Sequence, residues 1–176
     1  MQKDIHMLFL GDSLIADFPW NERLLNCTTE EIGIPGATAQ SILELLPSLN
    51  FQNEPDIIMV MLGTNNLYQG DYNFVPTLKN VVQQLNLSFP QAEILITTLL
   101  PMKLDHLAPE TITMVNDELN EMATKTGCCL LDMHSQFVNL PTETVFLPDN
   151  IHLTTTAYEL WCKNLLEHIA FLIESD

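Results

Sequence analysis

The segment Ile5–Leu10, with the sequence Ile-His-Met-Leu-Phe-Leu, leads directly into Gly11-Asp12-Ser13-Leu14. A short apolar run of this kind is typical of a buried β-strand. The small and polar residues that follow it fit a tight turn at the end of the strand. This strand-and-turn unit is the pattern from which the rest of the chain can be interpreted.

The same pattern recurs along the chain, with helix-like segments between the runs. Further strands are predicted at Cys27–Ile32, Ile57–Leu62, Ile94–Leu99 and Cys128–Leu131. Their near-continuous apolar character indicates a parallel sheet covered on both faces. Alternation of strands and helices predicts an α/β domain with five parallel strands and helices on both sides.

Helices are predicted where apolar residues recur at helical spacing. Three such stripes consist of Ile42, Leu45 and Leu46, of Val75, Leu78, Val82 and Leu85, and of Ile112, Val115, Leu119 and Met122. Pro109 and Gly127 are placed to begin and end the third of these helices. A last helix is predicted to begin near Thr156, with Glu159 at capping-box spacing, and to turn four apolar residues inward: Trp161, Leu165, Ile169 and Leu172.

Composition narrows the class of protein. The 176 residues include 6 Lys+Arg and 23 Asp+Glu, giving a formal net charge of −17, and 47% of them are apolar. These values predict one globular domain, residues 1–176, with a core that needs no metal or disulfide. The acid excess argues against nucleic acid and anionic membranes as partners, because both are bound through Lys and Arg.

No signal peptide or membrane span is recognisable, so a cytoplasmic location is expected. The four cysteines lack C-x-x-C spacing and are interpreted as reduced thiols: Cys27, Cys128, Cys129 and Cys162.

Four groups of small and polar residues follow predicted strands or precede the last helix. They are Gly11–Leu14, Gly33–Gly36, Gly63–Asn66 and Asp149–His152. In an open parallel sheet, functional residues gather in loops at the carboxyl ends of the strands. The four groups are therefore expected to meet at one edge and to form a site.

Ser13, His152 and Asp149 are the candidate catalytic residues. A serine hydroxyl is a poor nucleophile unless a base removes its proton. His152 can accept that proton near neutral pH and return it to the leaving group. Asp149, three residues earlier, can orient the imidazole and stabilise its charge.

The oxyanion of an acyl-transfer intermediate needs hydrogen-bond donors. The backbone N–H groups of Ser13 and Gly36 and the side-chain amide of Asn65 are the candidates. Gly36 suits this role because it lacks a side chain that would hold the substrate away from the backbone.

Other interpretations compete for each motif. Gly-Asp-Ser after a strand is common as a turn with a helix cap, and Asp12 is interpreted as a structural residue of that turn. His134, with Asp132 before it, is an alternative base that also follows a strand. A metal at Asp149 and His152 lacks a third ligand at a recognised spacing, and a phosphate loop at Gly33–Gly36 lacks G-x-G-x-x-G. No metal and no cofactor are therefore expected.

Taken together, the four groups resemble the ordered blocks of the GDSL, or SGNH, hydrolase family of esterases and lipases. The match continues through Leu153-Thr154 to Tyr158 and Trp161. This resemblance implies a three-layer α/β/α sandwich, sheet order 2-1-3-4-5, serine hydrolysis without a metal and a shallow, open site. It also supports Asn65 as an oxyanion donor. Asn66 stands where many members have Asp, a change expected to affect loop structure more than chemistry.

The sequence thus predicts a serine esterase that forms an acyl-enzyme on Ser13. Its expected substrate is a small or medium acyl ester of an alcohol, sugar or lysolipid. The acidic surface predicts a preference for neutral or cationic esters over anionic ones. Tyr68, Pro101 and Ile151 are placed at the rim by their position beside the blocks.

The alternative is a non-hydrolytic domain that binds an acylated sugar or peptide in the same cleft. Acyl length, leaving group and oligomeric state do not follow from the sequence.

Overall fold

A computed structural model of the chain describes residues 5–175, and the side chains of these residues except Pro109 and residues 172–175. Its strands form one sheet in the order β2-β1-β3-β4-β5, and each neighbouring pair is parallel. The strands are β1 (Ile5–Gly11), β2 (Cys27–Gly33), β3 (Ile57–Met61), β4 (Glu93–Thr97) and β5 (Cys129–Leu131). The predicted fold class, strand order and all five strands are confirmed.

Burial along the strands follows from their place in the sheet. Every residue of the central strand β3 is buried, as expected for a strand covered on both faces. The edge strand β2 differs, because it is half-exposed and carries Thr28, Glu30 and Glu31. The predicted near-continuous apolar character is therefore wrong for β2. An edge strand has one neighbour only, and charged residues on it discourage pairing with other chains.

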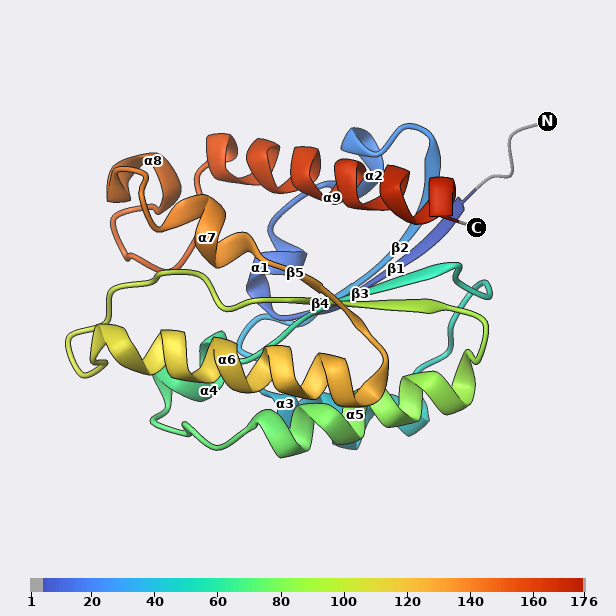
Figure 1. Cartoon of the computed structure of the whole chain (residues 1–176), viewed down its shortest axis with the longest axis horizontal. Coiled ribbons are helices and arrows are strands. Elements are labelled where there is room, and N and C mark those ends of the chain that lie inside the picture. Colours follow the sequence, from blue (N-terminus) through green and yellow to red (C-terminus); the bar gives the residue numbers. More distant parts are fainter. Residues whose placement is uncertain (1–4, 176) are drawn as a thin grey trace.

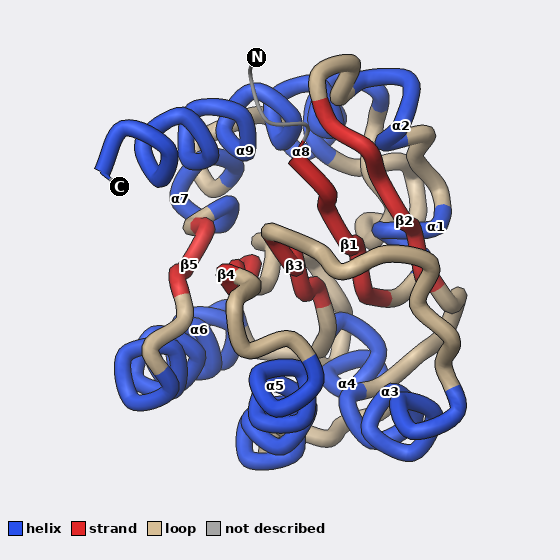
Figure 2. The backbone as a smooth tube through the Cα atoms, turned by 90° about the vertical axis from the view of Figure 1, so that its right-hand side faces the viewer, coloured by secondary structure: helices blue, strands red, loops and turns tan. Residues whose placement is uncertain are grey.

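Helices cover the two faces of the sheet as two layers. Figure 1 shows α2 and α9 along one face and α3, α5 and α6 along the other, and Figure 2 shows the same layers from the side. The longer helices are α3 (Ala39–Leu45), α5 (Val75–Ser88), α6 (Pro109–Thr126) and α9 (Thr155–Ser175). The shorter ones are α1 (Ser13–Ala16), α2 (Trp20–Arg23), the 3₁₀ turn η1 (Leu46–Ser48), α4 (Thr64–Tyr68), α7 (Met133–Phe137) and α8 (Thr142–Val145). Within the described residues, no helix is long and apolar enough to cross a membrane.

Most of the predicted helix boundaries are confirmed. Helix α6 begins at Pro109 and is capped by Gly127, whose φ of 76° is left-handed. The last helix, α9, starts at Thr155, in agreement with the predicted start near Thr156. Its cap differs from the prediction, because the hydroxyl of Thr154 and not that of Thr156 accepts a hydrogen bond at the helix start, from the N–H of Ala157 at 3.2 Å. Three consecutive threonines, at positions 154–156, are equally good candidates for the cap in the sequence, so the pattern alone does not identify the right one.

The apolar stripes of α5, α6 and α9 lie in the core as predicted, but in the first predicted stripe only Ile42 and Leu46 are buried and Leu45 is half-exposed. All four stripe residues of α5 and all four of α6 are buried, and so are Trp161, Leu165 and Ile169 of α9. Leu172 is also predicted to face inward, but its side chain lies outside the part of the chain that the structure describes. Cys162 is also buried, which raises the pKa of its thiol to about 11.

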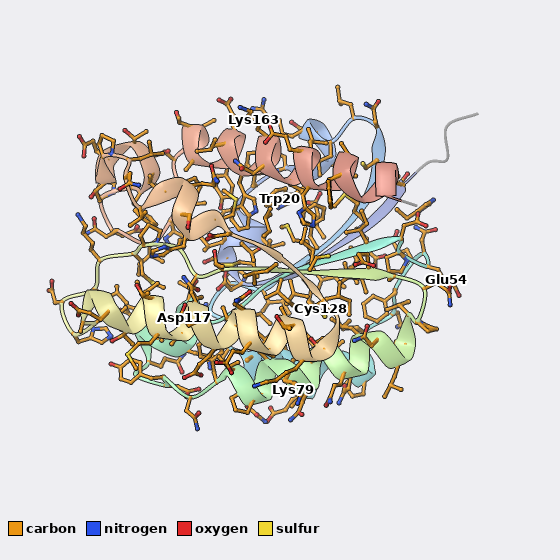
Figure 3. All side chains as sticks on the ribbon, viewed as in Figure 1. Trp20, Glu54, Lys79, Asp117, Cys128 and Lys163 are labelled. Carbon is orange, nitrogen blue, oxygen red and sulfur yellow. The ribbon has the colours of Figure 1, made fainter. Side chains whose placement is uncertain are left out.

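An aromatic cluster joins α9 to the start of the sheet. Trp20 is fully buried, stacks on Phe9 at 4.6 Å and meets Trp161 edge-on at 5.4 Å. Figure 3 shows Trp20 between α9 and the strands. The Trp20 Nε1–H donates to the carbonyl of Ile15 at 3.0 Å. This bond ties the short helix after β1 to the core.

The register of the sheet aligns the loops that follow the first three strands. Gly11, the last residue of β1, is level with Gly33 of β2 and with Met61 of β3. Because the strands are parallel, their carboxyl ends lie at one edge. The loops after β1, β2 and β3 therefore begin side by side.

Candidate active site

Ser13 is the first residue of α1, one residue beyond the turn that follows β1. Asp12 caps this helix, since its Oδ1 accepts a hydrogen bond from the N–H of Leu14 at 2.9 Å. Asp12, Leu14 and Ile15 are fully buried, whereas Ser13 remains partly accessible. The turn thus buries its neighbours and presents the serine hydroxyl at the end of the sheet.

His152 lies directly beside Ser13 although 139 residues separate them. The His152 Nε2 is 3.0 Å from Ser13 Oγ, and His152 Nδ1 is 2.7 Å from Asp149 Oδ2. The other carboxylate oxygen of Asp149 accepts the backbone N–H groups of Ile151 and His152 at 3.0 and 2.9 Å. The structure therefore brings the three predicted catalytic residues into one chain of contacts.

The charge of Asp149 determines which imidazole nitrogen can act as a base. Its slight burial acts to raise the pKa of this carboxyl, but hydrogen bonds from the His152 ring and from two backbone N–H groups outweigh it and lower the pKa to about 2. An ionised carboxylate only accepts hydrogen bonds, so Nδ1 of the neutral ring carries the proton. The lone pair of Nε2 then faces the Ser13 hydroxyl, as proton abstraction requires.

A second carboxyl, Asp12, lies in a very different environment beneath the site. Burial raises its pKa to about 7, against the opposing effects of the Leu14 N–H and the charge of His152. Its Oδ2 accepts a hydrogen bond from Asn65 Nδ2 at 3.3 Å. Asp12 thus holds the turn, as predicted, and also connects it to one of the predicted oxyanion donors.

The predicted oxyanion donors come from three different loops. The N–H of Ser13 begins α1 and has no carbonyl one turn earlier within that helix. Gly36 is exposed with a left-handed φ of 81°, and a Cβ built on it would meet nothing within 4 Å. The space that a side chain at position 36 would occupy is therefore open.

Asn65 is half-buried, and both hydrogens of its amide have acceptors. Asn65 Nδ2 donates to the carbonyl of Ala37 at 3.0 Å as well as to Asp12 at 3.3 Å. A substrate oxyanion has to compete with one of these acceptors, and the longer bond to Asp12 is the weaker competitor.

Local features of the loop after β3 explain how Asn65 is held. Gly63 has a left-handed φ of 119°, and a Cβ there would lie 2.3 Å from the ring of Phe74, so only glycine fits. Asn66 is buried, accepts the N–H of Ala39 at 3.0 Å and donates to Asp71 at 2.8 Å. Asn66 therefore links neighbouring loops, in keeping with the structural role expected of it.

The three predicted rim residues have different surroundings. Tyr68 is exposed and lines a hollow of about 450 Å³ together with Asp149. Pro101 lines an adjoining hollow of about 590 Å³, which shares Lys103 and Leu104 with the first and is not lined by any of the three candidate catalytic residues. Ile151 is half-buried and takes part through its backbone N–H to Asp149.

The alternative base has other partners. Asp132 caps α7 by accepting the hydroxyl and the N–H of Ser135, and His134 lines the hollow of about 590 Å³. His152, and not His134, is the histidine within hydrogen-bond distance of Ser13. Among the described residues, no group of three or more His, Cys, Asp or Glu side chains is arranged to hold a metal.

Two contacts at the site were not predicted. Asp17 Oδ2 lies 3.9 Å from His152 Nε2, and the hydroxyl of Tyr158 donates to the carbonyl of Leu14 at 2.9 Å. The spacing of Asp17 from Ser13, one helical turn, was a usable signal, because residues four apart share a helix face. The Tyr158 contact joins positions 144 residues apart and has no local signal.

Known proteins resemble this chain in sequence and in fold. Rat and human platelet-activating factor acetylhydrolase IB subunit alpha2 are each 28% identical to this chain over an alignment 186 positions long, which covers 98% of this chain and 79% of theirs. An acetyl xylan esterase from Geobacillus stearothermophilus matches the fold with a TM-score of 0.77 at 16% identity, covering 97% of this chain and 98% of that one. A family 3 carbohydrate esterase from Clostridium thermocellum matches with a TM-score of 0.79 at 14% identity, covering 98% of both chains.

The sequence also matches a family model directly. The model of the GDSL-like lipase/acylhydrolase family matches residues 9–160, which include Ser13, Asn65, Asp149 and His152. The family model, the ordered sequence blocks and the fold all agree. The chain therefore belongs to the GDSL-like lipase/acylhydrolase family, a class of carboxylic ester hydrolases.

Proposed function

We propose that the protein is a serine esterase that hydrolyses small or medium acyl esters through an acyl-enzyme on Ser13. The observation that carries this proposal is the contact chain from Ser13 Oγ to His152 Nε2 and from His152 Nδ1 to Asp149, at 3.0 and 2.7 Å. A nucleophile, a base and an orienting carboxylate within hydrogen-bond distance are the elements that acyl transfer requires.

In the first step, Ser13 Oγ attacks the ester carbonyl carbon while His152 Nε2 removes its proton. The oxyanion is stabilised by the N–H groups of Ser13 and Gly36 and by the amide of Asn65, which releases its bond to Asp12. The bond from carbon to the alcohol oxygen then breaks, and His152 returns the proton to that oxygen. Water repeats the sequence to release the acid and restore Ser13.

A short acyl group is the favoured substrate feature. The partial exposure of Ser13 and the 35% exposure of the His152 side chain fit an open site. The relatives are acetylhydrolases and one structural neighbour is an acetyl xylan esterase, which supports acetyl esters as the first substrates to test.

The test is hydrolysis of p-nitrophenyl acetate, butyrate and octanoate by wild type, Ser13→Ala and His152→Ala, with a parallel series in excess chelator. Each variant is expected to lose at least about 10⁴-fold in kcat, because catalytic groups of this kind act as a unit. Chelator is expected to leave the wild-type rate unchanged. Turnover that persists in Ser13→Ala would contradict the proposal.

A non-hydrolytic domain that binds an acylated sugar or peptide is the competing hypothesis. A serine-directed fluorophosphonate distinguishes the two, because an activated Ser13 is expected to react and an unactivated serine is not. Ser13→Ala provides the labelling background. Absence of wild-type labelling together with absence of turnover would favour the binding domain.

A further inference from the structure

Asp17 ends α1, one helical turn after Ser13, and its carboxylate reaches the reacting groups. Its Oδ2 lies 3.9 Å from His152 Nε2, the same nitrogen that lies 3.0 Å from Ser13 Oγ. The Asp17 side chain is 50% exposed, so a bound substrate can meet it. Among the described residues, no lysine or arginine forms an ion pair with Asp17.

The negative charge of Asp17 acts across the whole nucleophile turn. Burial is the main reason that the pKa of the Tyr158 hydroxyl is raised, and the charge of Asp17 is the next. Asp17 also adds to the raised pKa of Asp12, of which burial is again the main cause. A substrate positioned at Ser13 therefore lies in the field of a carboxylate that, among the described residues, no lysine or arginine neutralises.

The contact with Nε2 identifies the part of the substrate that Asp17 faces. In the mechanism proposed above, Nε2 delivers the proton to the leaving oxygen, which has to come within about 3 Å of that nitrogen. With 3.9 Å between Nε2 and Asp17 Oδ2, the leaving oxygen lies no more than roughly 7 Å from the carboxylate. A cation two carbons beyond the leaving oxygen comes within direct electrostatic reach of the carboxylate when the alcohol part of the ester is oriented toward Asp17.

On the basis of this proposed function, we infer that Asp17 is a specificity-determining residue that selects esters of cationic alcohols, the amino-alcohol class. Asp17 attracts the ammonium group of the alcohol while Ser13 takes the acyl group. The bond broken is the ester bond between the acyl carbon and the amino-alcohol oxygen, and the proton on that oxygen comes from Nε2. At these separations, one charge pair is expected to favour the cationic ester by about threefold to tenfold.

The experiment compares two esters that differ only in charge. Acetylcholine carries a quaternary nitrogen where 3,3-dimethylbutyl acetate carries a carbon, so shape and acyl group are matched. Acetate release gives kcat/KM for each ester with wild type, Asp17→Asn and Glu54→Gln, with Ser13→Ala as background. Glu54 is the matched control, because it is an exposed carboxylate that precedes β3. It therefore lies at the end of the sheet away from the loops that carry the site, as its place in Figure 3 shows.

The expected result is a wild-type ratio of about three to ten in favour of the cationic ester, falling toward one in Asp17→Asn and unchanged in Glu54→Gln. Added salt is expected to reduce the wild-type ratio, since screening weakens attraction between accessible charges. p-Nitrophenyl acetate hydrolysis that depends on Ser13 shows that Asp17→Asn is folded.

Three outcomes would overturn the inference. In the first, wild type treats both esters alike. In the second, Asp17→Asn changes both rates by the same factor, which would place the effect on His152 and not on the substrate. In the third, neither ester is cleaved although p-nitrophenyl acetate is, which would leave the proposed function standing. Failure of all three esters would instead contradict the proposed function itself.

Discussion

The two halves of the candidate site are built in opposite ways. Ser13 belongs to a turn whose neighbours Asp12, Leu14 and Ile15 are fully buried. The segment that carries the base is open, with the His152 side chain 35% and the Asp149 side chain 47% exposed. The serine is positioned by the core, and the histidine is positioned by hydrogen bonds within its own loop.

The bonds that hold each half follow the same division. Side chains from two other helices fix α1: Tyr158 of α9 donates to the carbonyl of Leu14, and Trp20, in the next helix along the chain, donates to that of Ile15. On the other side, Asp149 accepts the N–H groups of Ile151 and His152, three residues away at most. Substitutions in the base loop should therefore affect activity and spare stability, and substitutions around the turn should affect stability as well.

Asp149→Asn is expected to have the largest effect. Asparagine can present an N–H to Nδ1 and favour the wrong imidazole tautomer, so kcat is expected to fall by about 10³–10⁴-fold. The free energy of unfolding is expected to change by about 1 kcal/mol or less, because the interaction is solvent-exposed. Ester hydrolysis and urea unfolding of the same sample measure both. A loss of several kcal/mol of stability would contradict the division between the two halves.

Asp12→Asn tests the buried side through pH. The pKa of this carboxyl is about 7 in the folded chain against an ordinary 3.8, so the folded state binds more protons between these pH values. Wild-type stability from this group is therefore greatest below about pH 4, falls as pH rises to about 7, and levels off above it. Between about pH 4 and pH 7, the free energy of unfolding of the variant is therefore expected to rise by about 4 kcal/mol relative to that of wild type. Parallel denaturant titrations at several pH values would show this, and a constant difference would contradict it.

Asn65→Ala addresses the donor that bridges the turn and the loop after β3. Loss of one oxyanion donor is expected to reduce kcat by about 10²–10³-fold. Steady-state kinetics with p-nitrophenyl acetate measure this effect, and KM is expected to change much less. An unchanged kcat would show that Asn65 serves only its bonds to Ala37 and Asp12.

Tyr158→Phe should have the smallest effect of these substitutions. It removes the hydroxyl that satisfies the buried carbonyl of Leu14 and keeps the ring in the aromatic cluster. Unfolding free energy is expected to fall by about 1–3 kcal/mol, the cost of leaving a buried acceptor without its donor. Denaturant unfolding tests this, with Tyr72→Phe, an exposed tyrosine, as the matched control.

The contrast between the halves also explains what the sequence could predict. Apolar runs such as Ile57–Leu62 and the polar residues after them are local patterns in the sequence, so the strands could be predicted. Because parallel strands end at one edge of the sheet, the meeting of Ser13, Asn65 and His152 could be predicted as well. Thr154 could not be identified as the cap of α9, because three adjacent threonines have the same capping preference and the sequence does not distinguish between them. The competition between Asp12 and the oxyanion for Asn65 depends on side-chain directions across two loops, which no spacing encodes.

The central claim, that Ser13 is a nucleophile activated by His152, is tested most directly by labelling with a fluorophosphonate and mapping the modified peptide. The account predicts one modified residue, Ser13, in wild type, with slow labelling of His152→Ala and none of Ser13→Ala. Modification elsewhere, or ester turnover that survives in Ser13→Ala, would contradict it.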